Sequence, residues 1–492
     1  MKLGVLLNGV EMTGSPADSG IDIAGIAYDS RKAGKGDLFV AVRGEHVDGH
    51  AFAADAVRRG AAAVVYDNPQ ARQELAATGA ALVLVPDSRR ALALLSANLY
   101  EQPSEKLEVI GITGTNGKTT TSYLIKSILE AWGRKAGLIG TIQYMVGDEV
   151  FEADHTTPEA LEFQAMLRKM VDAGCSHVVS EISSHALAQG RVEGTVFGTA
   201  VFTNLTRDHL DFHKTMDEYF DAKERLFRDL LRSGGSSVIN YDDVWGRRLM
   251  ARVPAETVIT YGLETGADIM AADINNAFDG LRFTMVSRGG RYDVVSSLVG
   301  LPNVYNILAA AGAAAAIGAP WNVILEGVRG AGPVKGRFEK IDAGQSFLAV
   351  VDYAHTEDAL ERLIYTARGL TEGKVITVFG CGGDRDRGKR PRMGAIATKL
   401  SDFVVMTTDN PRSEDPLEIL MEIEKGAVRR NYLIEPDRQA AIRRAVLMAD
   451  DSDVVLVAGK GHEQYQETAG RRIAFSDRAV LEEAIHRLSE KK

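Results

Sequence analysis

A glycine-rich segment ending in lysine and threonine lies between an apolar run and a helical pattern. It comprises residues 111–120, Gly-Ile-Thr-Gly-Thr-Asn-Gly-Lys-Thr-Thr, and overlaps the apolar run 107–112. A strand that leads through glycines into a helix presents backbone N–H groups to phosphate oxygens. Lys118 can reach the outer phosphates, and Thr119 can bind Mg²⁺. The segment predicts a nucleotide-binding α/β sheet, although Ile112 stands where the pattern G-x-x-x-x-G-K-[ST] has its first glycine. A glycine-rich turn with a surface lysine is the alternative.

The same alternation of apolar runs and helical patterns recurs along the chain, whose 492 residues suggest about three domains. Breaker-rich stretches at 102–105 and 332–336 predict domains at 1–105, 106–335 and 336–492. A helix is predicted at 52–59 and an alanine-rich helix at 307–319. Residues 257–298 predict short, antiparallel strands. Other strands are predicted at 37–42, 61–66, 81–85, 107–112, 178–180, 199–202, 238–239, 347–352, 374–379, 403–407 and 454–458.

Charge and composition argue against a nucleic-acid-binding protein and against a membrane protein. The formal net charge is −10 and no long basic run occurs, which argues against nucleic-acid binding. The two cysteines, Cys175 and Cys381, are far apart and suit a reducing compartment. The apolar stretch 307–319 is too short to span a bilayer. We therefore expect a cytoplasmic protein without membrane insertion.

Polar side chains follow two of the predicted strands. Glu181 lies in Ser180–His185, after the strand 178–180, and His209 lies in Thr203–Asp211, after the strand 199–202. The carboxyl ends of strands in an open α/β sheet meet at the ligand crevice. This predicts Glu181 and His209 near Thr119 and a Mg²⁺ ion. The alternatives are a surface carboxylate and a histidine that makes a local hydrogen bond at a helix entry.

Lys223 lies in an apolar stripe. The segment 218–231 predicts an amphipathic helix whose stripe contains Phe220, Leu226, Phe227 and Leu230. At ~100° per residue Lys223 falls in the middle of that stripe. Either its stem is buried with the head in water, or it is a partly desolvated amine with a lowered pKa.

Two of these motifs resemble the Mur ligases. Gly114–Thr120 is similar to the ATP loop shared by Mur ligases and folylpolyglutamate synthetases, and Tyr219–Lys223 is similar to the Mur-ligase segment with a carbamylated lysine. The resemblance implies a UDP-binding N-terminal α/β domain, a central P-loop ATPase-like domain and a Rossmann-like C-terminal domain. It implies that Lys223 becomes a carbamate and holds Mg²⁺ with His209, so that the metal ligands are Thr119, Glu181, His209 and Lys223.

The resemblance also implies an ATP site, formed by Gly114, Thr115, Asn116, Gly117, Lys118, Thr119, Thr120, Asn303, Asn306, Arg337 and Asp352. Asn303 could equally be a helix N-cap. Glu357 departs from the family, which usually has proline there, and we expect only a local change in the loop.

The implied contacts to a UDP-muramoyl dipeptide are polar residues in the first two domains: Ser30, Thr156, Thr157, Ser183, Gln189 and Arg191. Hydroxyl groups can hold phosphate or carboxylate oxygens, and Arg191 can pair with an anion. From residue chemistry alone, Asp29-Ser30-Arg31 is only a turn.

Asp409, Asn410, Pro411 and Arg412 follow the strand 403–407 and read, from composition alone, as a turn. They match the signature of the Mur ligases that add meso-diaminopimelate. This amino acid has one carboxylate more than lysine, and a guanidinium binds a carboxylate bidentately. Three further residues match family contacts to the amino acid: Arg385, Gly459 and Glu463. A solvated basic loop is the alternative for Arg385.

The reaction implied is ATP-dependent amide-bond formation, with Lys118, Lys223, His209 and Glu181 as catalytic residues. ATP phosphorylates the D-glutamate carboxylate of UDP-N-acetylmuramoyl-L-alanyl-D-glutamate, and an amine of diaminopimelate attacks the acyl phosphate. The expected partners are these small molecules, with Mg²⁺ as cofactor and a monomeric enzyme. The alternatives are a lysine-adding or folylpolyglutamate-like ligase, or a P-loop nucleotide-hydrolysing switch that makes no bond.

Overall fold

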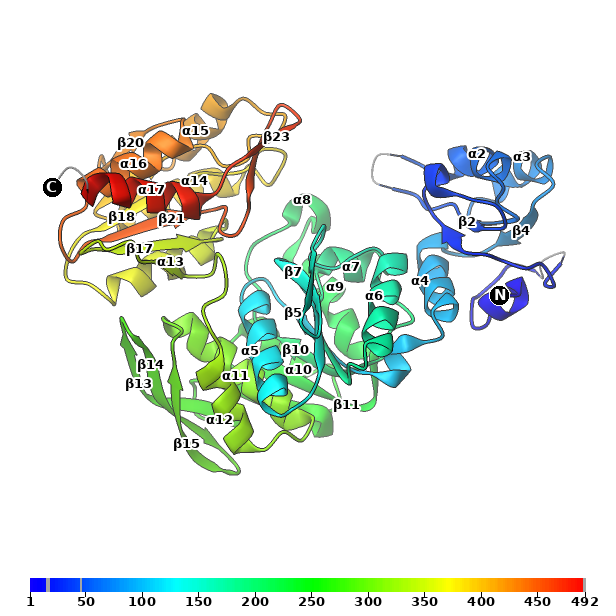
Figure 1. The fold of residues 1–492 in the computed structure, drawn as a ribbon, viewed down its shortest axis with the longest axis horizontal. Helices are drawn as coiled ribbons and strands as arrows, with labels where there is room; N and C mark the ends of the chain where they lie inside the picture. The colour runs from blue at the N-terminus through cyan, green and yellow to red at the C-terminus, as the bar shows by residue number, and fades with distance from the viewer. Residues whose placement is uncertain (15–17, 45–46, 490–492) are drawn as a thin grey trace. The chain divides into compact units, whose positions relative to one another are not determined.

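The computed structural model describes residues 1–14, 18–44 and 47–489 and confirms a mixed α/β fold (Figure 1). The chain forms two compact units. The first contains residues 1–113, 133–200 and 222–237, and the second contains residues 114–132, 201–221 and 238–492. Within the described ranges no helix is long and apolar enough to cross a lipid bilayer.

The first unit begins with a four-stranded parallel sheet, β1 (Ile26–Ala27), β2 (Leu38–Val40), β3 (Ala63–Tyr66) and β4 (Ala81–Leu84). β1, β2 and β3 are buried on both faces, as expected for apolar runs in a parallel sheet, whereas β4 at the edge is partly buried. One face packs on α1 (Leu3–Leu6) and α4 (Ser88–Leu99), and the other on α2 (Ala53–Arg58) and α3 (Arg72–Ala76). The βαβ prediction for this region is confirmed.

The rest of the first unit is built around the strand that precedes the glycine-rich loop. The strand order is β11-β10-β5-β9-β6-β7-β8, and β5 pairs in parallel with β9. β10, β11 and α9 each have residues in both units. The elements are β5 (Glu108–Thr113), β6 (Ala136–Ile139), β7 (Gln143–Val146), β8 (Glu149–Glu152), α6 (Ala160–Asp172), β9 (His177–Glu181), α7 (Ser184–Ala188), β10 (Phe197–Phe202), α9 (Met216–Arg228) and β11 (Leu231–Asn240).

The second unit includes the helix that follows the loop and an antiparallel extension of the sheet. β13, β14 and β15 are antiparallel, as expected for 257–298, but β12 pairs with β13 in parallel. The elements are α5 (Lys118–Ala131), α8 (Leu210–His213), α10 (Val244–Met250), β12 (Val258–Gly262), β13 (Ile269–Ala277), β14 (Gly280–Ser287), β15 (Gly290–Ser296), α11 (Leu301–Ala316) and α12 (Trp321–Gly330).

The C-terminal part of the second unit has a six-stranded sheet of order β16-β17-β21-β18-β19-β20, in which only β16 is antiparallel. Helices α13–α15 cover one face, and α16 and α17 cover the other. The strands of this sheet are β16 (Glu339–Ile341), β17 (Leu348–Asp352), β18 (Val375–Phe379), β19 (Phe403–Met406), β20 (Tyr432–Ile434) and β21 (Val454–Ala458). β22 (Tyr465–Thr468) and β23 (Arg471–Ala474) form a separate antiparallel pair. The helices are α13 (Glu357–Arg368), α14 (Lys389–Leu400), α15 (Pro416–Glu424), α16 (Arg438–Met448) and α17 (Asp477–Ser489).

The alanine-rich helix begins earlier than predicted. α11 starts at Leu301, with Pro302 in its first turn, where proline costs no helical hydrogen bond. Its N-cap is Gly300, with φ 92°, so the alternative reading of Asn303 as the N-cap is wrong. Asn303 and Asn306 therefore lie inside the helix, one turn apart.

Candidate active site

The glycine-rich loop has two glycines that no other residue can replace without strain. Gly114 has φ 145°, and a Cβ there would lie 1.9 Å from Thr203 Oγ1. Gly117 has φ 89°, and its Cβ would lie 2.5 Å from Asn306 Oδ1. Gly111, in contrast, lies within β5, where a Cβ would lie 2.8 Å from the ring of Phe197. The displaced glycine of the motif is thus required by strand packing, and the loop turns at Gly114.

Side chains of this loop hydrogen-bond within the second unit. Lys118 Nζ donates to the carbonyl oxygens of Gly114 (2.9 Å) and Thr115 (2.8 Å). Arg337 Nη2 donates to Thr119 Oγ1 at 3.2 Å, and its guanidinium lies 4.5 Å from the centre of the Tyr353 ring. The structure thus brings Arg337, a predicted ATP-site residue, to the threonine predicted to bind Mg²⁺.

The two α11 asparagines face the same loop. Asn306 Nδ2 donates to Asn303 Oδ1 at 2.9 Å, and Asn303 Nδ2 donates to the Val299 carbonyl oxygen at 2.7 Å. These two bonds fix the orientation of both amides. Asn306 Oδ1 also accepts from the Thr121 hydroxyl at 3.4 Å.

Asp352 is the last residue of β17, and its carboxylate binds two backbone N–H groups of neighbouring loops. Its carboxylate accepts from the backbone N–H groups of Phe338 (2.6 Å) and Ala354 (2.7 Å). Burial raises the pKa of Asp352, against the charge of Arg337 and these two hydrogen bonds. Glu357 is the first residue of α13, a position that suits proline and also suits an acidic side chain near the helix N-terminus. The departure from the family pattern is therefore local.

His209 lies beside a largely buried carboxylate, Asp208, that the sequence did not indicate. Asp208 Oδ2 is 3.4 Å from His209 Nε2 and 4.0 Å from His355 Nε2. Burial alone would raise the pKa of Asp208, but the charges of His209, His355 and Lys389 hold it at about 2. Burial and the charge of Lys389 lower the pKa of His355. Asp208 is thus a fixed negative charge next to the predicted metal ligand.

Glu181 is fully buried at the end of β9 and is held by a residue that the sequence did not indicate. Thr141 donates its backbone N–H to Oε1 (3.0 Å) and its hydroxyl to Oε2 (2.8 Å). In the described part of the chain no three His, Cys, Asp or Glu side chains gather as a metal site. Carboxylate oxygens such as those of Glu181 are of the type that Mg²⁺ prefers.

Lys223 is buried, with 1% of its surface exposed, so the alternative of an ammonium head in water is wrong. The predicted helix is confirmed as α9, although it ends at Arg228, before the predicted 231. The side chain of Lys223 therefore lies inside the protein, and the carbamate stays a prediction.

The residues predicted to hold the dipeptide gather in the first unit. Thr157 Oγ1 donates to the Glu181 carbonyl oxygen (2.8 Å) and accepts from the Ser183 N–H (3.0 Å). Arg191 Nη1 donates to the Thr157 carbonyl oxygen at 3.1 Å, and its Nε donates to Gln189 Oε1 at 2.9 Å.

Thr156 and Ser30 are the remaining residues predicted to contact the dipeptide. Thr156 Oγ1 is 3.1 Å from Thr141 Oγ1, which links this group to the residue that holds Glu181. Ser30 lies apart from these contacts, buried in the turn that Asp29 caps.

The predicted amino-acid residues follow three neighbouring strands, β21, β18 and β19. Asn410 Nδ2 donates to Glu463 Oε2 at 2.8 Å, and the buried Lys460 donates to both side chains. Asp409 Oδ2 is buried and has no hydrogen-bond partner among the described residues. Gly459 has φ 119°, and a Cβ there would lie 2.5 Å from this oxygen. We call Asp409, Asn410, Lys460 and Glu463 the C-terminal polar cluster.

The guanidinium groups of the two predicted arginines, Arg412 and Arg385, each donate to a backbone carbonyl oxygen. Arg412 has φ 53°, and its Nη1 donates to the Gly383 carbonyl oxygen at 2.7 Å. Arg385 is exposed, and its Nη1 donates to the carbonyl oxygen of Asp384 at 2.9 Å. Pro411 joins Arg412 to the cluster. Both guanidinium groups keep further N–H donors for an anion.

Two buried arginines support these loops. Arg438 donates to both Asp477 oxygens (2.7 and 2.8 Å) and to the carbonyl oxygens of Thr408 and Ala458. Arg390 pairs with Glu414 and Glu422. An arginine among the apolar positions of a helix could have indicated these two residues in the sequence, because a fully buried arginine requires partners.

Comparisons with known proteins agree with this arrangement. Family models match residues 22–100 (Mur ligase family, catalytic domain), 112–314 (Mur ligase middle domain) and 336–461 (Mur ligase, glutamate ligase domain). The UDP-N-acetylmuramoyl-L-alanyl-D-glutamate–2,6-diaminopimelate ligase of Solibacter usitatus is 47% identical, over 99% of this chain and 98% of that protein. The enzyme of the same name from Bacillus licheniformis is 47% identical, over 94% of this chain and 95% of that protein.

Solved structures show the same similarity. A structure titled as a UDP-N-acetylmuramoyl-L-alanyl-D-glutamate–2,6-diaminopimelate ligase is 34% identical, covers 99% of both chains and has a TM-score of 0.71. The MurF ligase of Thermotoga maritima in complex with ADP, 20% identical with a TM-score of 0.63, covers 96% of this chain and 97% of its own and shares the fold. The full-length identity to curated relatives, together with three matching family models in order, shows that this chain belongs to the Mur ligase family.

Proposed function

We propose that the chain is an ATP-dependent ligase that adds meso-diaminopimelate to the D-glutamate of UDP-N-acetylmuramoyl-L-alanyl-D-glutamate in peptidoglycan synthesis. Near-full-length identity to relatives with that name supports this activity. The residue that carries the choice of amino acid is Arg412, which follows Asn410 and Pro411 in the chain and whose guanidinium donates to the Gly383 carbonyl oxygen. Such a site offers a cation for the extra carboxylate of diaminopimelate and anions for its ammonium groups.

The reaction begins with attack of the D-glutamate carboxylate on the γ-phosphate of ATP, which releases ADP. The amine of diaminopimelate then forms a C–N bond to the acyl phosphate, and the C–O bond to phosphate breaks. The amine loses a proton in this second step. Lys118 and the backbone N–H groups of residues 114–120 stabilise the charge on the phosphates. Asn303, Asn306, Arg337 and Asp352 complete the proposed ATP site.

Mg²⁺, when bound, would supply further positive charge at the phosphates. The Thr119 hydroxyl and the Glu181 carboxylate are oxygen ligands of the kind that Mg²⁺ prefers. His209 and a carbamate on Lys223 would hold a second ion. Two observations support the carbamate: Lys223 is buried, and the segment Tyr219–Lys223 resembles the Mur-ligase segment with a carbamylated lysine.

The dipeptide substrate is assigned to the polar group of the first unit. Thr156, Thr157 and Ser183 offer hydroxyl groups, and Arg191 and Gln189 are already oriented by their mutual hydrogen bond. Ser30 is proposed to contact the uridine-sugar part. We assign the reaction to the cytoplasm and to a monomer of three domains, at 1–105, 106–335 and 336–492.

Mass spectrometry of the product separates the rival functions. The protein is incubated with ATP, Mg²⁺ and the UDP-muramoyl dipeptide, plus either meso-diaminopimelate or lysine. We expect a UDP-muramoyl tripeptide with diaminopimelate and little product with lysine. Equal product from lysine would indicate a lysine-adding ligase. Phosphate release without any new amide would indicate a nucleotide-hydrolysing switch and overturn the proposal.

A further inference from the structure

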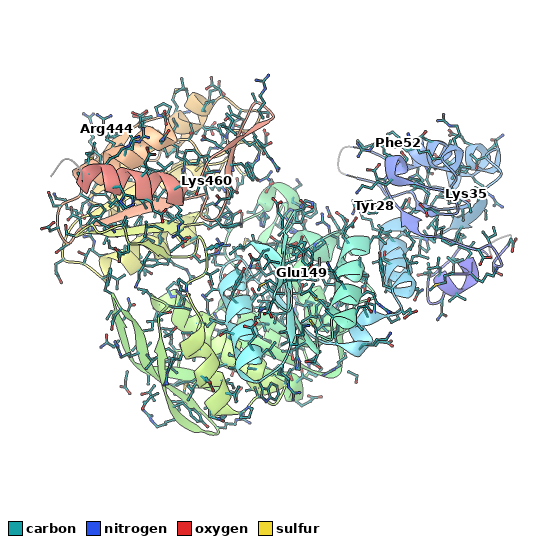
Figure 2. All side chains as sticks on the ribbon, in the orientation of Figure 1. Tyr28, Lys35, Phe52, Glu149, Arg444 and Lys460 are labelled. Atoms are coloured by element: carbon teal, nitrogen blue, oxygen red, sulfur yellow. The ribbon has the colours of Figure 1, made fainter. Side chains whose placement is uncertain are left out.

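Lys460 is buried inside the C-terminal polar cluster. It follows β21 and Gly459, its side chain is 0% exposed, and it is labelled in Figure 2. Its Nζ donates to Asn410 Oδ1 at 2.9 Å and to Glu463 Oε2 at 2.7 Å. Full burial of lysine is rare and requires partners of this kind.

These bonds fix the orientation of the Asn410 amide. Asn410 Oδ1 accepts from Lys460 and also from the backbone N–H of Glu467 at 2.9 Å. Both partners can only donate, so the atom they share must be the amide oxygen. The amide nitrogen therefore points to Glu463 Oε2, which accepts from it at 2.8 Å. One N–H of Asn410 remains for another acceptor.

Glu463 is left with one oxygen for a ligand. Oε2 accepts from both Lys460 and Asn410, whereas Oε1 has no hydrogen-bond donor among the described residues. Lys460 balances one of the two carboxylates, Asp409 and Glu463, so the cluster keeps one net negative charge. A single free carboxylate oxygen with a net negative charge suits an ammonium group.

We propose that Lys460 is a positioning residue for the amino-acid substrate: it turns Glu463 Oε1 and the free N–H of Asn410 toward the ammonium and carboxylate groups of that substrate. The inference rests on the proposed function. Without Lys460 the Asn410 amide can rotate, and Glu463 can turn either oxygen to the ligand. The substrate must then order these two side chains when it binds. We therefore expect the loss of Lys460 to weaken substrate binding more than it lowers kcat.

The test is a double-mutant cycle of Lys460→Met and Glu463→Gln, with KM measured for each of the three substrates. Methionine has a similar length and lacks the charge and donors. We expect Lys460→Met to raise KM for diaminopimelate at least tenfold, with a smaller change in kcat and with KM for ATP and the dipeptide unchanged. In the Glu463→Gln background the same substitution should raise KM less than threefold, because the partner is already altered.

Controls separate this role from general damage to the fold. Lys126→Met removes another buried lysine, one that is paired with Glu130 on α5, and should leave KM for diaminopimelate unchanged. Lys460→Arg keeps the charge and donors and should raise KM less than Lys460→Met does; this variant carries the test if Lys460→Met does not fold.

The two proposals fail differently. An equal effect of Lys460→Met in both backgrounds, an unchanged or lowered KM for diaminopimelate, or an equal rise in KM for all three substrates would overturn the positioning role. Absence of tripeptide product from the unmodified protein would instead overturn the proposed function.

Discussion

Arg412 combines an unfavourable backbone with a fixed guanidinium. A non-glycine residue at φ 53° is uncommon and persists where its surroundings hold it. The backbone N–H of Arg412 donates to the Glu467 carbonyl oxygen at 3.0 Å, and Nη1 donates to Gly383 at 2.7 Å. These contacts orient the side chain before any ligand binds, which favours specific recognition of a carboxylate.

We expect Arg412→Ala to lower kcat/KM for diaminopimelate about 10- to 100-fold, because a hydrogen-bonded charge pair is worth about 1.5–3 kcal/mol. Steady-state kinetics with diaminopimelate and with lysine measure the change. The value for lysine should fall much less, since lysine has no second carboxylate. Arg429→Ala, at an exposed position of the same domain, is the matched control. Unchanged kinetics for diaminopimelate in Arg412→Ala would show that this arginine does not select the amino acid.

The proposed carbamate on Lys223 makes the activity depend on carbon dioxide. We expect Lys223→Ala to lower turnover about 10- to 100-fold through loss of a metal ligand. With ¹³C-labelled bicarbonate, the unmodified protein should show a carbamate resonance by NMR that the variant lacks. Acidification should remove both the resonance and the activity, because protonation releases carbon dioxide from a carbamate. Full activity of the alanine variant would contradict this role.

The sequence predicted the local segments of the candidate site better than it predicted the residues that hold those segments in place. The glycine-rich loop and the apolar stripe around Lys223 are local patterns, so the sequence sufficed for them. Thr141, Asp208 and Lys460 acquire their roles from partners distant in sequence, and an isolated threonine or lysine carries no such signal. Their contacts required the fold.

At the level of elements, the parallel strands were the predictable part of the fold. Strands buried on both faces appear as continuous apolar runs, and β3, β17 and β21 lie where such runs occur. The β7–β8 hairpin was not predicted, although Gly147, with φ 59°, marks its turn. α12 was not predicted either. Short amphipathic elements give weak periodicity, and their burial depends on neighbours that a sequence does not specify.

The Arg438–Asp477 pair connects α16 and α17 with the ends of β19 and β21. Both side chains are 0% exposed. We expect Asp477→Ala to lower the free energy of unfolding by about 3–5 kcal/mol, because it leaves a buried guanidinium without its partner. Glu482→Ala removes a partly exposed pair with Arg478 on the same helix and should cost less than about 1 kcal/mol. Urea unfolding followed by circular dichroism compares the two, and equal losses would contradict the argument.

On the scale of the whole molecule, polar contacts within the second unit join residues of the glycine-rich loop to the C-terminal sheet domain. Asn116 Nδ2 donates to Asp358 Oδ2 at 2.9 Å, and Arg337 donates to Thr119. Arg207 pairs with Asp386 at 3.1 Å. Such contacts exchange readily with water and ligands, so relative motion of the domains is the expectation. The sequence carries no signal for such contacts.

Three substrates must meet in one site from which water is excluded, and we therefore expect the domains to close during the reaction. Small-angle X-ray scattering should show a smaller radius of gyration with Mg²⁺, a non-hydrolysable ATP analogue and the UDP-muramoyl dipeptide than with none of them. Asp386→Ala removes the contact to Arg207 and should change the domain arrangement of the ligand-free protein. It should not weaken ATP binding, because Asp386 is assigned no contact to the nucleotide. Its free-state profile should therefore differ from that of the unmodified protein while the liganded profiles coincide. Identical profiles with and without ligands would mean that the substrates bind to an arrangement already closed.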